Sequence, residues 1–536
     1  MLKNQVFIPS VFVMYIFLWT GINFFLLISF PFMHSDESWL AGLSRAILLE
    51  NTPAATEPFF NLVTRAPHAI KIFFHGLQIL FIKIFGYNLF SIRLLQLLTG
   101  STALFVFGGL LQRLKLPQIP GVIILSVQIQ FIYASHFGRQ EIQILLLMLL
   151  SLSLLYRDTE DVTGSSFRRG LIAGIPIAAA IGFHPNAFIA AWPAGLVLLY
   201  EIIRGRRRPS EGLGYLMLPA ASAVIFVMLS LSFSNSFVSS YGSFGEEVGV
   251  LEAFDVKLLG FDDFYRKLFL RVSGTYYTPR IWPVFIIAAA ATVSLILTGL
   301  YYRVKQVAAC SPAAVLTAAS GIAGVNIGIL VIGKYSAPAV VFVIPFLIIL
   351  ISAGIEELSQ LSSPGLVRPV LYTAAAALLL LNSVHMIMQE TGGTRESYDN
   401  FTQQIRRAVP PLMSGTAAAE SRVLGPLTAG FAFEYGRLLD WRNLTALRDA
   451  GLSLDDYIRA NNVEYIIYTE EFDLIYKQRP VWNVLYGNPT IYHEELQDIL
   501  NNKCELISEF ASPGYGTRIV LHREKKDWFV RVYSVR

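Results

Sequence analysis

Long apolar runs constrain the fold of this chain more than any other feature of its sequence. A helix crosses a bilayer with about 17 to 25 consecutive apolar residues. Hydrophobic residues make up 54% of the 536 residues and charged residues only 15%, which excludes an ordinary soluble globular protein. We therefore predict a polytopic α-helical membrane protein with about eleven transmembrane helices, at residues 6-30, 90-112, 119-135, 138-156, 170-183, 186-203, 213-233, 281-302, 312-333, 335-354 and 369-389. The runs 170-183 and 186-203 are either two short helices or one broken helix.

The basic residues lie in alternate loops between these runs. With the N-terminus in the cytoplasm, the cytoplasmic loops hold Arg113, Lys115, Arg157, Arg168, Arg169, Arg204, Arg206, Arg207, Arg208, Arg303, Lys305 and Arg368. This is the positive-inside distribution of a multi-pass protein of the plasma or inner membrane. It places the loops 31-89 and 234-279, and everything after residue 389, outside the cytoplasm. The net charge is only +4 and the basic residues form no single stripe, so nucleic acid is not an expected partner.

The last part of the chain has a different character. From residue 390 the charge density rises, and strand-like runs at 464-468 and 517-521 alternate with helical patterns at 395-408, 454-461 and 491-501. We therefore divide the chain into a transmembrane domain, 1-389, and an extracytoplasmic α/β domain, 390-536.

Two adjacent carboxylates, Asp36 and Glu37, follow the first apolar run, and His34 precedes them. Ionisable groups at the rim of a membrane usually mark a function. The alternative is that the two acids only cap the first turn of the next helix. The loop that they open is about sixty residues long, which is too long for a simple connection and indicates a functional segment.

Further charged and histidine residues lie on the same outer face. Arg65 and His68 flank Pro67 in the first external loop, and Arg139 and Glu141 stand where the run 138-156 begins. The alternative for Arg65 is that it is an ordinary interfacial arginine. The alternative for Arg139 is that it forms a purely structural pair with Glu141. The remaining outer candidates are His184, Lys334 and Tyr335.

In their order along the chain, these motifs resemble those of the C-type superfamily of membrane glycosyltransferases (GT-C), in particular the branch with protein O-mannosyltransferases and lipid A aminoarabinose transferases. The matching elements are His34-Ser-Asp-Glu37, Arg65-Ala66-Pro67-His68, Phe85-Gly86, Arg93-Leu94-Leu95, Arg139-Gln140-Glu141 and Lys334-Tyr335-Ser-Ala-Pro338. The sequence departs from the family pattern at Ala66, His68, Leu95 and Glu141, which bears on the identity of the substrate more than on the reaction class.

The resemblance implies transfer of a sugar from a polyprenyl-phosphate-linked donor to a lipid, glycan or protein acceptor at the extracytoplasmic face. Asp36 is the expected general base, in an attack that inverts the anomeric centre. Glu37 and Glu141 are expected to orient the acceptor, or to hold a divalent cation (Mg²⁺ or Mn²⁺), although their spacing alone does not form a ligand set. The expected phosphate ligands are Arg65, Arg93, Lys334 and Tyr335, with His34, His68, Arg139 and His184 in supporting or acceptor-binding roles.

Three other functions stay open at this point. Many spans with charges at their edges are also typical of secondary transporters, although no internal repeat relates two halves of this chain. A lipid-linked oligosaccharide ligase or polymerase would share the donor chemistry but would carry its large loop late in the chain. A non-catalytic receptor would leave Asp36 and Arg65 unexplained.

The charge distribution generates a test of the topology. In a chain whose Cys310 and Cys504 are replaced by serine, the variants Ser397→Cys and Ser210→Cys should label from opposite sides of the membrane. We expect a membrane-impermeant thiol reagent, applied to intact cells, to modify only the cysteine at position 397. Equal labelling of both positions from outside would contradict the eleven-span topology.

Overall fold

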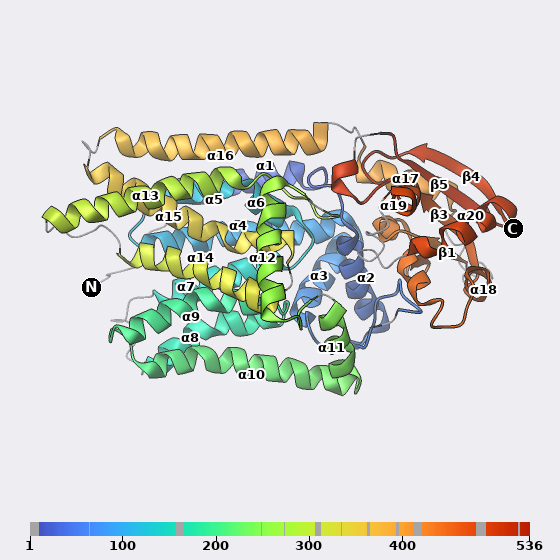
Figure 1. Cartoon of the computed structure of the whole chain (residues 1–536), viewed down its shortest axis with the longest axis horizontal. Coiled ribbons are helices and arrows are strands. Elements are labelled where there is room, and N and C mark those ends of the chain that lie inside the picture. Colours follow the sequence, from blue (N-terminus) through green and yellow to red (C-terminus); the bar gives the residue numbers. More distant parts are fainter. Residues whose placement is uncertain are drawn as a thin grey trace.

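In the computed structural model, helices fill one end of the molecule and a small sheet the other (Figure 1). The structure describes residues 10-63, 65-156, 166-247, 249-272, 274-305, 312-333, 335-361, 365-392, 396-410, 421-478, 489-523 and 526-536. The helices of the bundle are α1 (Ser10–Leu26), α4 (Leu89–Arg113), α5 (Gln118–Ser126), α6 (Ile129–His136), α7 (Glu141–Leu155), α8 (Ser166–Ile181), α9 (Ala187–Ile203), α10 (Pro209–Phe233), α13 (Trp282–Lys305), α14 (Pro312–Ile332), α15 (Ile344–Leu361), which follows the 3-10 turn η2 (Ala337–Phe342), and α16 (Val367–Gly392).

Every apolar run in the sequence coincides with one of these helices, and the run 119-135 coincides with the pair α5 and α6. Among the described residues, six helices are long and apolar enough to cross a membrane, or seven when α5 and α6 form one bent span. The polytopic helical class is thus confirmed, whereas the number of eleven spans stays a prediction. The runs 170-183 and 186-203 form two separate helices, α8 and α9.

Local sequence explains two features of the bundle. The axes of α5 and α6 differ in direction by 68°, and α6 begins as a new helix at Gln128, whose side chain accepts a hydrogen bond from the backbone N–H of Phe131. Helices α8 and α10 approach closely because glycines stand at their crossing. A Cβ atom on Gly170 would lie 1.9 Å from the Glu211 carbonyl oxygen, so only glycine fits there.

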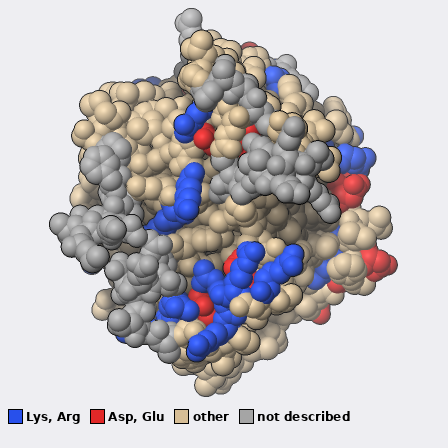
Figure 2. Space-filling model, turned by 90° about the vertical axis from the view of Figure 1, so that its left-hand side faces the viewer, with Lys and Arg blue, Asp and Glu red and all other residues tan. Residues whose placement is uncertain are grey.

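The basic residues of the bundle gather at the end that is remote from the sheet (Figure 2). The turn between α9 and α10 lies at this end, where Arg206 pairs with Glu201 at 3.2 Å and Arg207 pairs with Glu211. The clustering of basic residues at this end agrees with the positive-inside expectation. The orientation in the membrane remains a prediction from the sequence.

Four further helices belong to the two long loops. The first loop contains α2 (Ser35–Glu50) and α3 (Ile72–Phe85), which lie between the bundle and the sheet end in Figure 1. The second loop contains α11 (Phe237–Glu247) and α12 (Phe254–Leu270), and α12 runs across the bundle rather than along it.

The C-terminal part is a mixed sheet covered by short helices. Its strand order is β2-β1-β3-β5-β4, with β2, β1 and β3 parallel and β3, β5 and β4 antiparallel. The elements are β1 (Arg422–Gly425), β2 (Leu438–Asp440), β3 (Val463–Thr469), β4 (Cys504–Ala511), β5 (Phe529–Val535), α17 (Tyr398–Ala408), α18 (Leu454–Ala460), α19 (Glu471–Gln478) and α20 (His493–Asn502), with the 3-10 turns η4 (Leu427–Ala432), η5 (Trp441–Ala446), η7 (Pro489–Tyr492) and η8 (Val520–His522).

The α/β character of this part is as expected, but one strand prediction is wrong. The run 464-468 lies in β3, whereas the run 517-521 leads into the turn η8. Ile519 is fully buried in a small cluster with Trp528, and this packing holds the segment outside the sheet. The strand beside β3 is instead the last one, β5.

The sheet domain packs against the first long loop, residues 31-89, through a shared core. Phe59 and Phe60 of the loop lie in one cluster of buried side chains with Tyr398, Phe401 and Phe431 of the C-terminal part. The Ser38 hydroxyl of α2 donates to the Leu427 carbonyl oxygen at 2.5 Å, and the Asp440 N–H donates to the Phe59 carbonyl oxygen at 3.1 Å. The position of α2 is therefore fixed by the bundle on one side and by the sheet domain on the other.

Candidate active site

The N-terminus of α2 places the two candidate carboxylates in one helical turn. His34 is the N-cap: its Nδ1 atom accepts from the Asp36 N–H at 3.0 Å, and its own N–H donates to Glu37 Oε2 at 3.0 Å. Acidic side chains in a first turn also complement the helix dipole. Glu37 therefore takes part in capping the helix, whereas the Asp36 side chain is available for other contacts.

Glu37 is fully buried in an ion pair with Arg93, which is itself 0% exposed. The Arg93 guanidinium donates through Nε to Oε1 at 2.9 Å and through Nη2 to Oε2 at 2.8 Å, and the Gly138 N–H donates to Oε1 at 2.9 Å. The second terminal nitrogen of Arg93, Nη1, donates to the carbonyl oxygens of Leu27 and Pro31. Arg93 thus binds protein groups here rather than facing outward toward a phosphate.

Asp36 has a different environment from Glu37. Its Oδ2 atom accepts from Arg139 Nη1 at 2.7 Å and from the Tyr276 hydroxyl at 2.6 Å, and 19% of its side chain is exposed. Burial by itself disfavours the charged carboxylate, but His34, Arg139 and the Tyr276 hydrogen bond outweigh it and hold the pKa of Asp36 well below its usual range. Asp36 is therefore ionised at neutral pH.

Aromatic stacking holds His34 beside this carboxylate. The His34 ring lies parallel to the Tyr276 ring, with 4.4 Å between their centroids, and meets Phe137 edge-on. Burial lowers the pKa of His34 to about 4, so the imidazole is neutral at pH 7 and its Nδ1 atom can accept from the backbone. Its position next to Asp36 fits the supporting role that the sequence assigned to it.

Glu141 begins α7 on the other side of Arg139. The Glu141 Oε1 atom lies 3.0 Å from Arg139 Nη2, yet neither carboxylate oxygen forms a hydrogen bond of good geometry with a described residue, and the side chain is 3% exposed. The neighbouring Gln140 is also buried with both amide atoms unpaired among the described residues. Buried polar atoms of this kind normally bind water or a ligand, so this corner of the site is polar and incompletely satisfied by protein groups.

Arg65, from the loop between α2 and α3, lies beside Trp39, the α2 residue one helical turn after Asp36. Its guanidinium carbon is 4.6 Å from the centroid of the Trp39 ring, and Trp39 follows Asp36 by three residues on α2. Arg442, from the turn η5 of the sheet domain, lies 4.3 Å from the centroid of the same ring. Two cations from distant parts of the chain therefore meet at one indole beside the acidic turn.

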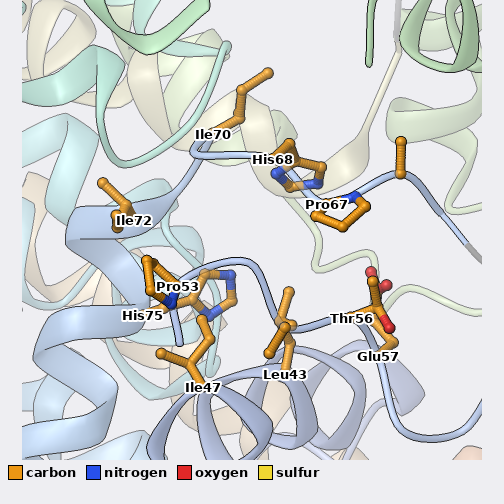
Figure 3. Close-up of a pocket in the computed structure, with 12 residues that line it drawn as sticks. Leu43, Ile47, Pro53, Thr56, Glu57, Pro67, His68, Ile70, Ile72 and His75 are labelled. Carbon is orange, nitrogen blue, oxygen red and sulfur yellow. The ribbon is translucent and has the colours of Figure 1, made fainter. Parts of the chain in front are cut away.

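His68 lies further along the same loop, in a narrow pocket between α2 and α3 (Figure 3). The free volume of this pocket is about 10 Å³, roughly the space that one water molecule needs. His75 lines the pocket as well, and its Nδ1 atom lies 2.8 Å from the Ser44 hydroxyl. The His68 ring packs edge-on against Phe237 and Tyr241 of α11, which links the two long loops.

The other sequence candidates lie apart from the acidic turn or outside the described residues. The Tyr335 ring packs against Phe261 and Phe264 of α12, and its hydroxyl donates to the Lys257 carbonyl oxygen. His184 caps the turn between α8 and α9, where its Nδ1 atom accepts from the Asn186 N–H at 3.0 Å. Lys334 lies outside the described residues.

The carboxylates do not form a metal site. Within the described ranges, no group of three or more His, Cys, Asp and Glu side chains could hold an ion. Both Glu37 oxygens already accept from Arg93, and Glu141 lies against Arg139, so the expected cation between these two glutamates does not fit the arrangement.

Two residues of the site, Tyr276 and Arg442, were not found from the sequence. Tyr276 is 240 positions from its partner Asp36, in the second long loop. The unusual length of the loop 234-279 was the only signal for Tyr276. Arg442 stands in a stretch of mixed polar composition, and no local pattern distinguishes it from other arginines of the domain.

The Glu37–Arg93 pair generates a stability test. Arg93→Ala should lower the free energy of unfolding by about 3 to 5 kcal/mol, because it leaves the buried Glu37 carboxylate without its counter-charge. Arg368→Ala is the matched control: its guanidinium is 47% exposed beside Glu356, and its loss should cost about 1 kcal/mol or less. Chemical unfolding of the purified proteins in detergent measures both values. Equal losses would mean that the buried pair does not stabilise the α1–α2 corner.

Comparisons with known proteins identify the fold. No family model matches the chain, and no curated protein matches it. Among solved structures, ArnT from Cupriavidus metallidurans bound to undecaprenyl phosphate is similar over 98% of both chains, with a TM-score of 0.55 and 14% identity, and its apo state gives 0.56. The apo oligosaccharyltransferase of Archaeoglobus fulgidus gives 0.52 at 12% identity, over 88% of this chain and 71% of that one. The chain therefore has the fold of the GT-C membrane glycosyltransferases.

Proposed function

We propose that this protein transfers a sugar from a polyprenyl-phosphate-linked donor to an acceptor at the extracytoplasmic membrane surface, with Asp36 as the general base. The observation that carries the proposal is the partly exposed, ionised Asp36 carboxylate, held by Arg139 and Tyr276 at the first turn of α2. The fold supports the reaction class, and the relative from C. metallidurans was solved with undecaprenyl phosphate, a lipid of the proposed kind.

Exposure favours Asp36 over the other two acids as the base. A general base must come within hydrogen-bond distance of the proton that it accepts. The Glu37 side chain is 0% exposed and that of Glu141 3% exposed, whereas that of Asp36 is 19% exposed. We therefore assign Glu37 and Arg93 to positioning the turn that carries Asp36, and Glu141 to positioning Arg139.

The proposed reaction is a single displacement. The acceptor oxygen or nitrogen attacks the anomeric carbon from the face opposite to the phosphate, and the bond between that carbon and the phosphate oxygen breaks. The acceptor proton passes to Asp36, and polyprenyl phosphate leaves as the anion. One displacement at the anomeric carbon inverts its configuration.

The ion pair between Arg139 and Asp36 affects the transfer of the acceptor proton to Asp36. A carboxylate with a depressed pKa is fully ionised but is a weak base, since an effective base has a pKa closer to the working pH. A donor phosphate bound at Arg65, one helical turn from Asp36, brings a negative charge toward the carboxylate and so raises its pKa. Donor binding would in this way increase the basicity of Asp36 just before the acceptor is deprotonated.

We assign the donor phosphate to the cations around Trp39. Arg65 lies at the indole within one turn of Asp36, and Arg442 approaches the same ring from the sheet domain. A guanidinium binds phosphate through two parallel hydrogen bonds, and the indole keeps it in place. Arg93 is not part of this assignment, because its donors are committed to Glu37, Leu27 and Pro31.

The first functional prediction concerns the base. Asp36→Asn should lower the turnover number about 10²- to 10⁴-fold while the protein stays folded, because the amide keeps the size of the side chain and cannot accept the proton. Asp399→Asn, at an exposed position on α17, is the control and should leave turnover unchanged. Turnover is measured with a polyprenyl-phosphate sugar and the native acceptor. If Asp36→Asn kept half of the wild-type value, the carboxylate would have a structural role only.

The second functional prediction separates donor binding from acceptor binding. Arg65→Ala should raise the apparent Michaelis constant for the donor about tenfold, the effect of losing one charge-assisted contact of about 1.4 kcal/mol or more. Arg65→Lys should recover only part of this loss, since an ammonium keeps the charge but not the forked geometry. The acceptor constant should change little in both variants. A rise in the acceptor constant alone would move Arg65 to the acceptor side.

A further inference from the structure

A second and larger pocket lies on the opposite side of α2 from Asp36. Arg45 of α2 lines it and follows Asp36 by nine residues, which is two and a half helical turns and roughly 13 Å along the axis. The pocket has a volume of about 340 Å³, within the range of small-molecule sites. Its other main lining residues are Tyr87, Arg406, Phe433, Glu434 and Arg437.

The charge of this pocket is strongly positive. Three guanidinium groups line it, from α2, from α17 and from the segment before β2, and Glu434 is the one carboxylate among the lining residues that the structure describes. Glu434 pairs with Arg437 at 3.3 Å, and 45% of its side chain is exposed. Two positive charges therefore remain uncompensated by the described lining residues, which favours the binding of an anion there.

Backbone contacts hold two of the guanidinium groups, those of Arg406 and Arg45, in place. Arg406 donates to the carbonyl oxygens of Phe431 and Ala432, at 2.8 Å and 3.2 Å, and Arg45 donates to the Phe433 carbonyl oxygen at 3.1 Å. The Arg45 guanidinium also lies 4.5 Å from the centroid of the Tyr87 ring. The cations are thus positioned without a ligand, which reduces the entropy that binding would cost.

Arg437 has a nitrogen atom without a hydrogen-bond acceptor among the described residues. The residue is 5% exposed, and its Nη1 atom donates to the Pro410 carbonyl oxygen at 2.8 Å. Its Nε atom is buried and has no hydrogen-bond acceptor among the described residues. A buried guanidinium N–H without an acceptor is unfavourable, so Arg437 has unused hydrogen-bonding capacity beside the pocket that it lines.

We infer that this pocket binds a phosphate group, carried either by the headgroup of an anionic lipid or by a soluble phosphorylated molecule. Forked guanidinium donors from three elements match the several oxygens of a phosphate better than they match a single carboxylate. The site stands on the other face of α2 from the acidic turn, so the inference does not depend on the proposed sugar transfer.

Two binding experiments on the purified full-length protein test the inference and distinguish the two sources. In the first, inorganic phosphate is titrated into the protein in neutral detergent and the heat of binding is measured. In the second, the protein is reconstituted in phosphatidylcholine nanodiscs with a small fraction of phosphatidic acid, and native mass spectrometry counts the anionic lipids that stay bound. Binding in the first experiment indicates a soluble ligand, and retention in the second alone indicates a lipid headgroup.

Variants from two different elements show whether the binding belongs to this pocket. Arg406→Gln and Arg45→Gln should each weaken phosphate binding, or lower the retention of phosphatidic acid, about tenfold. Arg407→Gln is the matched control, because it removes the same charge from an exposed position next to Arg406 on the same helix, and it should change binding less than twofold. Circular dichroism confirms that each variant is folded.

The inference is overturned by either of two results. One is the absence of binding in both experiments with the wild-type protein. The other is an equal loss of binding in Arg406→Gln and Arg407→Gln, which would mean that a diffuse surface charge attracts the anion. Because neither experiment measures sugar transfer, a failure here leaves the role of Asp36 untouched.

Discussion

The buried ion pair between Glu37 and Arg93 is the contact on which the site depends. Arg93 of α4 reaches the carbonyl groups at the end of α1, and Glu37 accepts from the N–H of Gly138 ahead of α7. One pair of charges therefore joins the helices α1, α4 and α7 of the bundle to the start of α2. Removing two charges from water costs free energy, and here several directed hydrogen bonds to each charged group offset that cost. The same turn orients Asp36 toward Arg139 and Tyr276.

The features that could be predicted from the sequence are those that depend on a short segment of the chain. Apolar runs of membrane-spanning length located every helix of the bundle, because burial in lipid acts on each segment separately. The acids at 36 and 37 were found because they stand at the end of such a run. The contacts of Tyr276 and Arg442 could not be found in this way, since they depend on which loops meet in space. The strand predicted at 517-521 failed for a related reason, because the packing of Ile519 against Trp528 outweighed the β-propensity of the run.

Arg93 illustrates why an interfacial arginine is ambiguous in sequence. A cation near the membrane surface can bind a phosphate or can neutralise an acid of the protein, and both choices leave the same residue pattern. In the structure Arg93 is enclosed with Glu37, whereas Arg65 stands at Trp39 with a second cation, Arg442, from the C-terminal part. The order of motifs along the chain could not make this distinction, because it depends on three-dimensional packing.

The position of β5 has a consequence for biogenesis. This strand follows β4 along the chain, yet it lies between β3 and β4 inside the sheet, and the domain that it completes supplies Arg442 to the ring of Trp39. During synthesis the acidic turn emerges first, and the sheet that carries Arg442 is incomplete until β5 has also emerged and joined it. A chain that lacks β5 would thus carry the carboxylates beside an unfinished sheet, so the two cations at Trp39 would come together only after β5 is made.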